Sequence, residues 1–473
     1  MEPLWTARVA AAATGGRTAG DWRATGVSID SRSIARGDLF IALAGPSFDG
    51  HNFVADALAK DASAAVVSRR PSGEVDDRKL LMVADTMKAL QDLGRASRDR
   101  ARGKICAVTG SAGKTGVKEA IRLALAALGP TAASTGSLNN HWGVPLSLAR
   151  MHQDSHYGVF EAGMNHPGEL AVLTRMIRPH VAVITNVEAA HTEFFDSLDQ
   201  VADAKAEILE GIEPDGTAVL NRDSPFFGRL AAAAARNRNI AHIVSFGRDS
   251  AAEVRLIDAE PGPDSSLVRA SVFGTEISFR VGMAGPHWVM NSLTTLAAVH
   301  ALGGDVARAA ESLAQLAPLP GRGQRFECAV AGGTITVIDE SYNANPASMR
   351  AAIATLATAP TGRGGRRIAA LGEMRELGPQ SAALHAGLAA PLAAAGIELI
   401  FTCGAEMEHL HDALPRALRG GHAADASELA RMLIAALHPG DVLMVKGSHA
   451  SNMGAVIQAI CRNWPAPRRA ANG

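Results

Sequence analysis

The segment 109–115 constrains the fold more than any other part of the chain. It reads Thr-Gly-Ser-Ala-Gly-Lys-Thr, follows the apolar run 105–108 and precedes the helical pattern 117–128. A buried strand, a glycine-rich loop and a helix in this order form a phosphate cradle, because free N–H groups at the helix N-terminus point at the anion. The segment therefore predicts an α/β domain that binds a phosphorylated ligand.

The residue types in this loop predict binding of a nucleoside triphosphate. Lys114 can reach the terminal phosphates, and the Thr115 hydroxyl can ligate Mg²⁺. The backbone that would wrap the phosphates is that of Gly110, Ser111, Ala112 and Gly113. The alternative is an ordinary glycine-rich turn with an exposed lysine, since short Gly/Lys patterns also arise by chance.

Length and composition narrow the class of protein. A chain of 473 residues is too long to fold around a single hydrophobic core, so we expect roughly two to four domains. The chain has 46 Lys and Arg against 47 Asp and Glu, which argues against a nucleic-acid partner. Four scattered cysteines without a C-x-x-C pair argue against a disulfide framework or zinc site. The sequence shows no signal-peptide pattern and no apolar run long enough to span a bilayer. We therefore expect a cytoplasmic protein without membrane insertion.

Alternating strand and helix patterns divide the chain into three blocks, which we place at residues 1–100, 101–317 and 318–473. The Pro/Gly-rich stretch 318–323 marks the second boundary. Expected strands cover 38–43 and 64–68 in the first block, 157–161, 181–186, 217–220 and 240–246 in the second, and 334–339, 367–371, 399–403 and 442–446 in the third. Helices are expected over 86–98 and 291–302, and a β-meander over 254–280. This alternation predicts mostly parallel sheets covered by helices.

Polar residues past the loop form further candidates. Glu161 ends an expected strand, where a metal ligand belongs, although a solvated loop glutamate is the alternative. His191 follows the strand 181–186 and is either a metal ligand or a structural histidine. Lys205 would by default be an exposed helical lysine. The turn 339–346 is dense in hydrogen-bonding side chains and holds one of only two tyrosines.

Taken together and in this order, these motifs resemble the Mur ligase family of ATP-dependent amide-bond-forming enzymes. The order runs from the phosphate loop through Glu-x-Gly, Ala-Ala-His, Ala-Lys-x-Glu, Gly-x-His-x-x-x-Asn and Pro-Gly-Arg to the polar Asn/Pro turn. The resemblance covers nearly the whole chain. It implies a three-domain α/β architecture with a central P-loop parallel-sheet domain, an N-terminal domain for a UDP-sugar peptide and a Rossmann-like C-terminal domain for the incoming amine.

The resemblance also implies roles for particular residues. Catalytic roles fall to Lys114, Lys205 and His191, and the ligands of two Mg²⁺ ions would be Thr115, Glu161, His191 and Lys205, the last of these carbamylated. Contacts with ATP fall to the loop 110–115, Asn291, Arg322, Asp339, Tyr342 and Asn343. Arg322 would reach the phosphates only on domain closure. Contacts with the other substrates fall to Ser31, Arg32, Asp49, His51, Asn139, Asn140 and Lys446.

Three segments, 136–145, 341–345 and 372–378, are most similar to the family branch that joins D-alanyl-D-alanine to UDP-N-acetylmuramoyl-tripeptide, and 446–448 points the same way. The Asp-Asn-Pro-Arg signature of the diaminopimelate-adding branch is absent from the sequence. The branch implies these two small-molecule substrates and an acyl-phosphate intermediate. Because all parts of the expected site come from one chain, we expect a monomer. The alternatives are a sibling ligase that adds a single amino acid, a P-loop kinase or GTPase, and a non-catalytic nucleotide-binding scaffold.

Three positions depart from the family pattern. Gly116 stands where relatives often have Thr or Ser, and Trp288 stands where many have the first Asn of Gly-x-His-Asn-x-x-Asn. Asn291 would then carry the adenine contact. Glu340 stands where close relatives often have a second Asp, so Asp339 and Glu340 are both candidates for the ribose.

Overall fold

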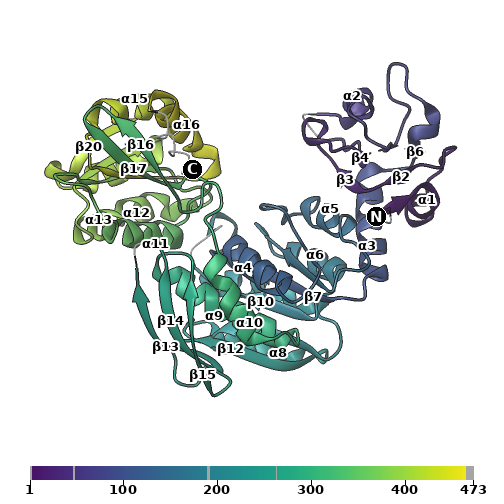
Figure 1. The fold of residues 1–473 in the computed structure, drawn as a ribbon, viewed down its shortest axis with the longest axis horizontal. Helices are drawn as coiled ribbons and strands as arrows, with labels where there is room; N and C mark the ends of the chain where they lie inside the picture. Colours follow the sequence, from purple (N-terminus) through teal and green to yellow (C-terminus); the bar gives the residue numbers. More distant parts are fainter. Residues whose placement is uncertain (1–2, 46–47, 189–191, 263, 465–473) are drawn as a thin grey trace, which may run out of the picture.

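The computed structural model describes residues 3–45, 48–188, 192–262 and 264–464, and it contains three parallel-rich sheets along the chain (Figure 1). The N-terminal sheet has the order β3 (Gly26–Ser28), β4 (Asp38–Ile41), β5 (Ala64–Val67) and β6 (Leu80–Met82), all parallel. β4 and β5 are buried along their whole length, as expected for strands covered on both faces. The other N-terminal elements are β1 (Trp5–Thr6), α1 (Ala7–Thr14), β2 (Arg23–Ala24), α2 (Val54–Ala59) and α3 (Thr86–Arg100).

The central sheet has nine strands in the order β15-β14-β13-β12-β11-β10-β7-β9-β8. Its strands are β7 (Lys104–Thr109), β8 (Thr131–Ala133), β9 (Tyr157–Glu161), β10 (Val181–Ile184), β11 (Gly216–Asn221), β12 (Ile240–Gly247), β13 (Val254–Pro261), β14 (Ser266–Val272) and β15 (Thr275–Val281). β7 lies between β10 and β9, and the three run parallel. The loops that follow these strands therefore meet at one edge of the sheet, where ligands bind in open α/β folds.

Helices cover both faces of this sheet. One core packs α4 (Lys114–Ala126), α9 (Pro286–Ala301) and α10 (Val306–Ser312) against the strands. The other packs α5 (Gly143–Ala149), α6 (Glu169–Ile177), α7 (Leu198–Ala206) and α8 (Phe227–Arg236) on the opposite face. The P-loop helix α4 thus sits beside α9, which returns from a distant part of the sequence.

The C-terminal sheet has the order β16-β17-β21-β18-β19-β20, in which only β16 is antiparallel to its neighbour. Its strands are β16 (Gln324–Val330), β17 (Gly333–Glu340), β18 (Arg367–Gly372), β19 (Leu399–Cys403), β20 (Arg419–Ala423) and β21 (Val442–Lys446). Its helices are α11 (Pro346–Ala357), α12 (Ser381–Ala386), α13 (Ala389–Ala394), α14 (Glu408–Ala413), α15 (Ala426–Ala436) and α16 (Gly454–Asn463). Two separate cores on its two faces confirm the layered α/β architecture.

Most expected elements lie within one or two residues of their observed bounds, with clear exceptions. The helix expected from Asn291 begins at Pro286, which takes the first helical position, where a missing N–H costs nothing. The helix expected over 117–128 begins earlier, at Lys114, because the glycine loop ends directly in its first turn. The edge strands β16 and β20 were not expected from the sequence.

The N-terminal and C-terminal domains lie on either side of the central domain (Figure 1). The N-terminal side is joined to it by α5, whose Leu146 and Ala149 belong to the N-terminal core. Trp5 Nε1 donates to the Ala149 carbonyl at 2.9 Å, and Arg150 Nε donates to the Val27 carbonyl at 2.6 Å. Among the described residues, no helix is long and apolar enough to cross a membrane.

Candidate active site

The phosphate loop connects β7 to α4 and depends on two glycines. Gly110 has a φ of +149°, and a Cβ there would lie 1.9 Å from Thr185 Oγ1. Gly113 precedes α4 with a φ of +81°, the left-handed region that glycine adopts without strain. Lys114 Nζ folds back over the loop and donates to the Gly110 carbonyl at 2.8 Å. The loop thus has the backbone shape and the cation that the sequence predicted.

The segment after β10 holds this loop in place. Thr185 Oγ1 donates to the Ala112 carbonyl at 2.7 Å, and the Ala112 N–H donates to Asn186 Oδ1 at 2.8 Å. The Ser111 hydroxyl donates to the Glu188 carbonyl at 3.0 Å and accepts from the Glu188 N–H at 2.9 Å. Thr185 and Asn186 were not among the predicted site residues, although their place at the end of the strand beside β7 was a usable signal.

Glu161, at the end of β9, faces the phosphate loop as a buried carboxylate. Its side chain is 1% exposed, which rules out the solvated-loop interpretation. Thr115 Oγ1 donates to Glu161 Oε2 at 2.7 Å, and Asn139 Nδ2 donates to Glu161 Oε1 at 2.7 Å. A hydroxyl and a carboxylate held together are the hard oxygen donors that Mg²⁺ prefers. Asn139, predicted as a substrate contact, here orients the acid.

Lys205 is buried in the same region. It lies on α7, is 1% exposed, and is therefore not the surface lysine that the sequence allowed. Burial, with the nearby Lys114 ammonium, lowers the pKa of Lys205 well below its usual value. Burial also lowers the pKa of Lys114, with Glu161 opposing the shift and Arg322 adding to it. His191, the remaining predicted catalytic residue and metal ligand, lies outside the described residues.

Asn291 and Arg322 approach the loop from different directions. Asn291 comes from α9, and a Cβ on Gly113 would lie 3.3 Å from Asn291 Oδ1. Arg322, from the linker before β16, donates from Nη2 to Ser137 Oγ at 3.1 Å and lies 4.0 Å from the Tyr342 ring centroid. The expected ATP contacts Asn291, Arg322 and Tyr342 are thus brought to the neighbourhood of the loop by two domains.

The polar turn after β17 reaches the loop directly through Asn345. Its Nδ2 donates to the Ser111 carbonyl at 3.1 Å, while its Oδ1 accepts from the Ser348 N–H and caps α11. Asn345 lies in the motif 341–345 but was not among the predicted site residues. The signal was its place before Pro346, typical of a helix N-cap.

Glu340 and Asn343 contact a buried lysine, whereas Asp339 bonds within its own turn. Lys446 is 3% exposed, donates from Nζ to the Asn343 carbonyl at 2.9 Å, and lies 3.5 Å from Glu340 Oε2. Burial lowers the pKa of Lys446, and the Glu340 carboxylate opposes that shift. Asp339 Oδ1 accepts from the Ser341 N–H at 3.0 Å, within its own turn.

Two groups that belong to sequence motifs but were not among the predicted site residues lie at the adjacent strand ends. Glu373, after β18, is buried, pairs with Arg375 at 2.6 Å and accepts the Glu406 N–H at 3.1 Å. Ser448, after β21, donates its N–H to the Glu373 carbonyl at 2.9 Å. Its hydroxyl is buried without a hydrogen-bond partner among the described residues. Since β18 and β21 are neighbours in the sheet, the motifs 372–378 and 446–448 converge.

The predicted N-terminal contacts gather at the carboxyl ends of β3, β4 and β5. His51, 2% exposed, contacts Asp49 Oδ1 through Nδ1 at 2.7 Å, and its Nε2 accepts the Ser68 N–H at 3.0 Å. The bond from Ser68 requires an unprotonated Nε2, so Nδ1 carries the hydrogen of the neutral ring. Arg69, which sequence analysis missed, pairs with Asp49.

The other predicted substrate contacts bond with residues of their own neighbourhood. Arg32 is 87% exposed and pairs with Asp30 at 2.7 Å, and the Ser31 carbonyl accepts from Lys60 Nζ at 3.0 Å. Asn140 has a structural contact of its own, because its Oδ1 accepts the Gly143 N–H at 2.9 Å at the start of α5.

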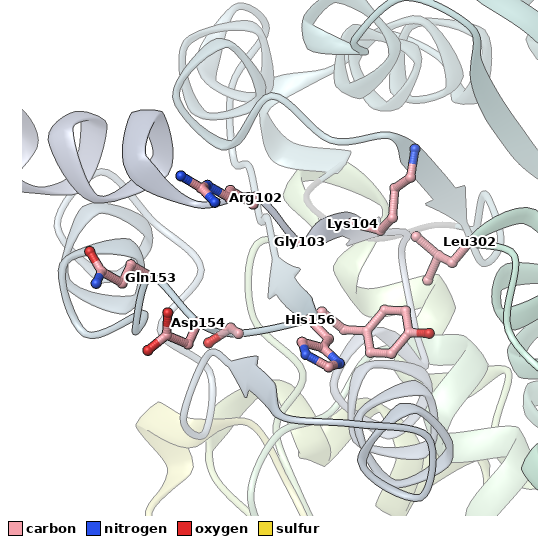
Figure 2. A pocket seen from close by; sticks show the side chains of 9 residues that line it. Arg102, Gly103, Lys104, Gln153, Asp154, His156 and Leu302 are labelled. Atoms are coloured by element: carbon pink, nitrogen blue, oxygen red, sulfur yellow. The ribbon is translucent and has the colours of Figure 1, made fainter. Parts of the chain in front are cut away.

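A separate hollow of about 410 Å³ opens at the opposite edge of the central sheet (Figure 2). It lies at the amino ends of β7 and β9, beside Lys104, His156 and Tyr157. Ligands of open α/β sheets bind at the carboxyl ends of the strands. This hollow is therefore not part of the candidate active site.

The fold and the site define a three-domain P-loop enzyme in which a phosphate loop, a buried acid and a buried lysine meet residues of a third α/β domain. The chain belongs to the Mur ligase family. Its residues match the models of the Mur ligase middle domain over 108–299, the glutamate ligase domain over 324–449 and the Mur ligase family catalytic domain over 23–98. The resemblance inferred from the motifs is confirmed.

The chain is 30% identical to the UDP-N-acetylmuramoyl-tripeptide–D-alanyl-D-alanine ligase of Rickettsia prowazekii, over 96% of this chain and 99% of that protein. It is 32% identical to the Escherichia coli enzyme of the same name, over 92% of this chain and 94% of that protein. A crystal structure of MurF from Acinetobacter baumannii superposes with a TM-score of 0.82 at 31% identity, covering 98% of this chain and 99% of that one. These similarities favour a ligase over the kinase and scaffold alternatives.

Proposed function

We propose that the protein is the ATP-dependent ligase that joins D-alanyl-D-alanine to UDP-N-acetylmuramoyl-tripeptide, in the cytoplasmic synthesis of peptidoglycan precursors. One observation carries this proposal. Lys114, the Thr115–Glu161 pair and Lys205 gather at one sheet edge, and Arg322 and Asn345 reach the same edge from the C-terminal domain. Relatives at 30% and 32% identity over nearly the whole chain carry this activity in their names.

The site supports activation of a carboxylate by phosphoryl transfer. A carboxylate oxygen of the tripeptide attacks the γ-phosphorus, the bond to ADP breaks, and an acyl phosphate forms. The dipeptide amine then attacks the acyl carbon, loses a proton and expels phosphate, which leaves an amide. Lys114 and Arg322 offset the negative charge where the two anions meet, so the protein contributes positioning and electrostatics, not a nucleophile.

The residues present fit Mg²⁺. Thr115 Oγ1 and Glu161 supply oxygen donors, and Asn139 holds the carboxylate in orientation. Bound there, Mg²⁺ would supply further neutralisation of the phosphate charge. No three His, Cys, Asp or Glu side chains cluster as metal ligands in the described parts of the chain. The donor set therefore depends on a hydroxyl and on Lys205, with His191 as the further proposed ligand.

We infer that Lys205 is carbamylated. Carbamylation needs an unprotonated amine, which attacks carbon dioxide and releases a proton, and the lowered pKa of Lys205 favours that form. The product is an anionic oxygen ligand in place of a buried cation. We expect Lys205→Ala to lose turnover and short carboxylic acids to restore part of it. Lys88→Ala, at an exposed lysine of α3, is the control and should respond to neither change. Full activity of Lys205→Ala without added acid would remove Lys205 from the site.

We further propose where the two peptide substrates bind. The dipeptide would lie at the carboxyl ends of β21 and β18, where Lys446, Arg375, Glu373 and the Ser448 hydroxyl offer both charges and a hydrogen-bonding group. The UDP-sugar would lie at the strand ends that carry Ser31, Arg32, Asp49 and His51. Because every part of this site comes from one chain, we propose a monomer.

The deciding experiment is phosphate release by the purified protein with ATP, Mg²⁺ and UDP-N-acetylmuramoyl-tripeptide. D-alanyl-D-alanine and single amino acids are supplied in turn as the acceptor. Release that requires D-alanyl-D-alanine supports the proposal. Release with a single amino acid only would reassign the protein to a sibling ligase. Release with none of the acceptors would contradict the ligase mechanism.

A further inference from the structure

We propose that Trp288 is a positioning residue for nucleotide binding, and that it can act only because residue 116 has no side chain. In this arrangement the Trp288 ring fills the space beside Gly116 and holds Asn291 over the phosphate loop. The proposal rests on the proposed function in one respect, namely that the bound nucleotide is ATP. It assigns a role to the two departures, Gly116 and Trp288, that the sequence alone left unconnected.

The first observation is the close approach of α9 to Gly116. Gly116 is the third residue of α4, in the turn that follows the phosphate loop. A Cβ on Gly116 would lie 3.1 Å from Trp288 Cη2 and 3.5 Å from Trp288 Cζ3. Both atoms belong to the outer six-membered ring of the indole, so it is the far end of this large side chain that occupies the space.

The second observation is the position of Asn291. A Cβ on Gly116 would lie 3.3 Å from Asn291 Nδ2, and a Cβ on Gly113 would lie 3.3 Å from Asn291 Oδ1. The amide of Asn291 therefore spans the first turn of α4, where the N–H groups that face a phosphate begin. Any side chain at position 116 must displace Asn291, Trp288 or both.

The third observation connects the two side chains. Trp288 and Asn291 are three residues apart on α9 and so share one helix face. Trp288 is 9% exposed and packs in the core that joins α4 to α9. A rigid ring anchored in this core fixes the distance between the two helices, and with it the place of Asn291.

A purely structural role for Trp288 predicts a different outcome from a positioning role. If Gly116 only weakened a helix, Gly116→Ala would stabilise the protein and leave nucleotide binding unchanged, since alanine is the better helix former. If the pair positions Asn291, the added Cβ must weaken nucleotide binding although helix propensity improves. Gly228, in the first turn of α8, is a matched control because a Cβ there has no atom within 4 Å.

The experiment measures ADP binding by calorimetry on the full chain, without peptide substrates, together with thermal unfolding of each variant. We expect Gly116→Ala to raise the Kd for ADP by about 10-fold, which corresponds to the loss of one hydrogen bond of about 1.4 kcal/mol. The KM for ATP should rise in parallel while kcat and the KM for the peptide substrates change little. Gly228→Ala should bind ADP like the wild type.

A second substitution that shortens the ring at position 288 tests whether the clash with Trp288 is what weakens ADP binding. Phenylalanine lacks the outer ring atoms that meet a Cβ at position 116, so Trp288→Phe in the Gly116→Ala background should restore most of the ADP affinity. Wild-type ADP binding by Gly116→Ala, or no relief by Trp288→Phe, overturns the proposal. If Gly116→Ala does not fold, the ADP affinity of the single variant Trp288→Phe is measured instead. This change leaves a gap beside Gly116, so Asn291 should lose its position and ADP should bind more weakly. Unchanged ADP affinity in that variant then overturns the proposal.

The two proposals fail in different measurements. Failure of the ligase function would appear as no turnover by the wild-type protein with any acceptor. Failure of the positioning role would appear as unchanged ADP binding in the variants of an active wild-type enzyme.

Discussion

At the scale of single residues, the buried Lys205 and the partly buried Lys114 dominate the electrostatics of the phosphate loop. Lys114 and Lys205 both have lowered pKa values, first because of burial and, for Lys205, also because of the Lys114 ammonium. A second ammonium close to Lys114 is therefore disfavoured, which favours the unprotonated amine of Lys205. An anionic phosphate chain would stabilise the ammonium of Lys114, whose pKa is lowered in this site, so charge favours ligand binding here.

Lys114→Ala should abolish turnover and leave the fold intact. The change removes the cation that neutralises the terminal phosphates. It also removes a partly buried charge whose pKa is lowered by desolvation, so the free energy of unfolding should not fall. We expect kcat/KM to drop by about 10³-fold or more, a loss typical of an essential electrostatic contact. Phosphate-release assays with circular dichroism check this. Near-normal turnover would contradict the mechanism, and Lys88→Ala serves as the control.

His180 predicts an acid-sensitive component of stability. Burial, with Lys104 and Arg98 nearby, lowers the pKa of His180 to about 4, against an ordinary 6.5. Its Nδ1 accepts the Ile105 N–H at 3.0 Å at the start of β7, so protonation of Nδ1 would break that bond. The unfolded chain binds the extra proton between these two pKa values. The stabilisation is therefore complete above pH 6.5 and is lost as the pH falls toward 4.

When the pH falls from 7 to 5, the titration of His180 should lower the free energy of unfolding by about 1 kcal/mol. This figure is reduced for solvent screening because His180 is only partly buried. His180→Asn keeps an acceptor near the Ile105 N–H and does not titrate, so its stability should fall less over this range. Denaturant unfolding at several pH values checks this, with the exposed His242→Asn as control. Parallel pH profiles for the wild type and His180→Asn would contradict the assignment.

At the scale of elements, the order of strands decides which loops meet. Glu161 pairs across the sheet with Val108, and Thr109 pairs with Ile184, so the ends of β9 and β10 flank the phosphate loop. Buried apolar runs predict strands but not their order in a sheet, because parallel neighbours can be far apart in the sequence. Once that order is known, the contacts of Thr185 and Asn186 with the loop follow.

Asn140 illustrates how an element can depend on a predicted site residue. Its Oδ1 accepts the N–H groups of Gly143 at 2.9 Å and Trp142 at 3.3 Å, at the start of α5. Asn140→Ala should lower the free energy of unfolding by about 1 kcal/mol, while Asn140→Asp should retain most of it. Thermal unfolding of both variants checks this. Equal loss in both would show that the hydrogen bonds of Asn140 Oδ1 do not stabilise the turn that leads into α5. The KM for the UDP-sugar peptide, measured alongside, tests the predicted substrate contact.

At the scale of the whole molecule, few polar contacts between described residues connect the C-terminal domain to the phosphate loop. Asn345 contacts Ser111, and Arg350 lies 3.4 Å from Glu188, an ion pair whose partners are both half exposed. Exposed ion pairs contribute little to stability. The glycine-rich linker around Arg322 has φ values of +71° at Gly321 and +85° at Gly323, so it can change conformation at low cost. Such an interface favours relative motion of the domains.

Arg322 should couple nucleotide binding to that motion. Its guanidinium lies over Tyr342 of the C-terminal domain and donates to Ser137 of the central domain. We expect ATP analogues with Mg²⁺ to reduce the radius of gyration of the wild type, and Arg322→Ala to lose this change. Solution X-ray scattering with and without nucleotide checks this. Equal compaction of both proteins would remove Arg322 from closure. Arg363→Ala, at an exposed arginine of the C-terminal domain, is the control.

The sequence by itself determined the parts of this protein that depend on local interactions. The strand, glycine-rich loop and helix at 104–126 were predictable because the glycines, the lysine and the start of the helix are contiguous in the sequence. The alternating strand and helix patterns predicted three α/β blocks. Motif order was enough to indicate the family. The candidate positions Glu161, Lys205 and Arg322 also came from motifs.

Only the tertiary structure decided which of these residues meet and what else they touch. Lys205 reads as a surface lysine until the packing of α7 buries it, and Ser448 and Glu373 converge only because β18 and β21 are neighbours. Asn345, Thr185 and Asn186 contact the loop across separations of 73 to 234 residues. Gly116 and Trp288 looked like unrelated departures, yet their closeness explains both. Such contacts depend on long-range packing, which no local pattern in the chain encodes.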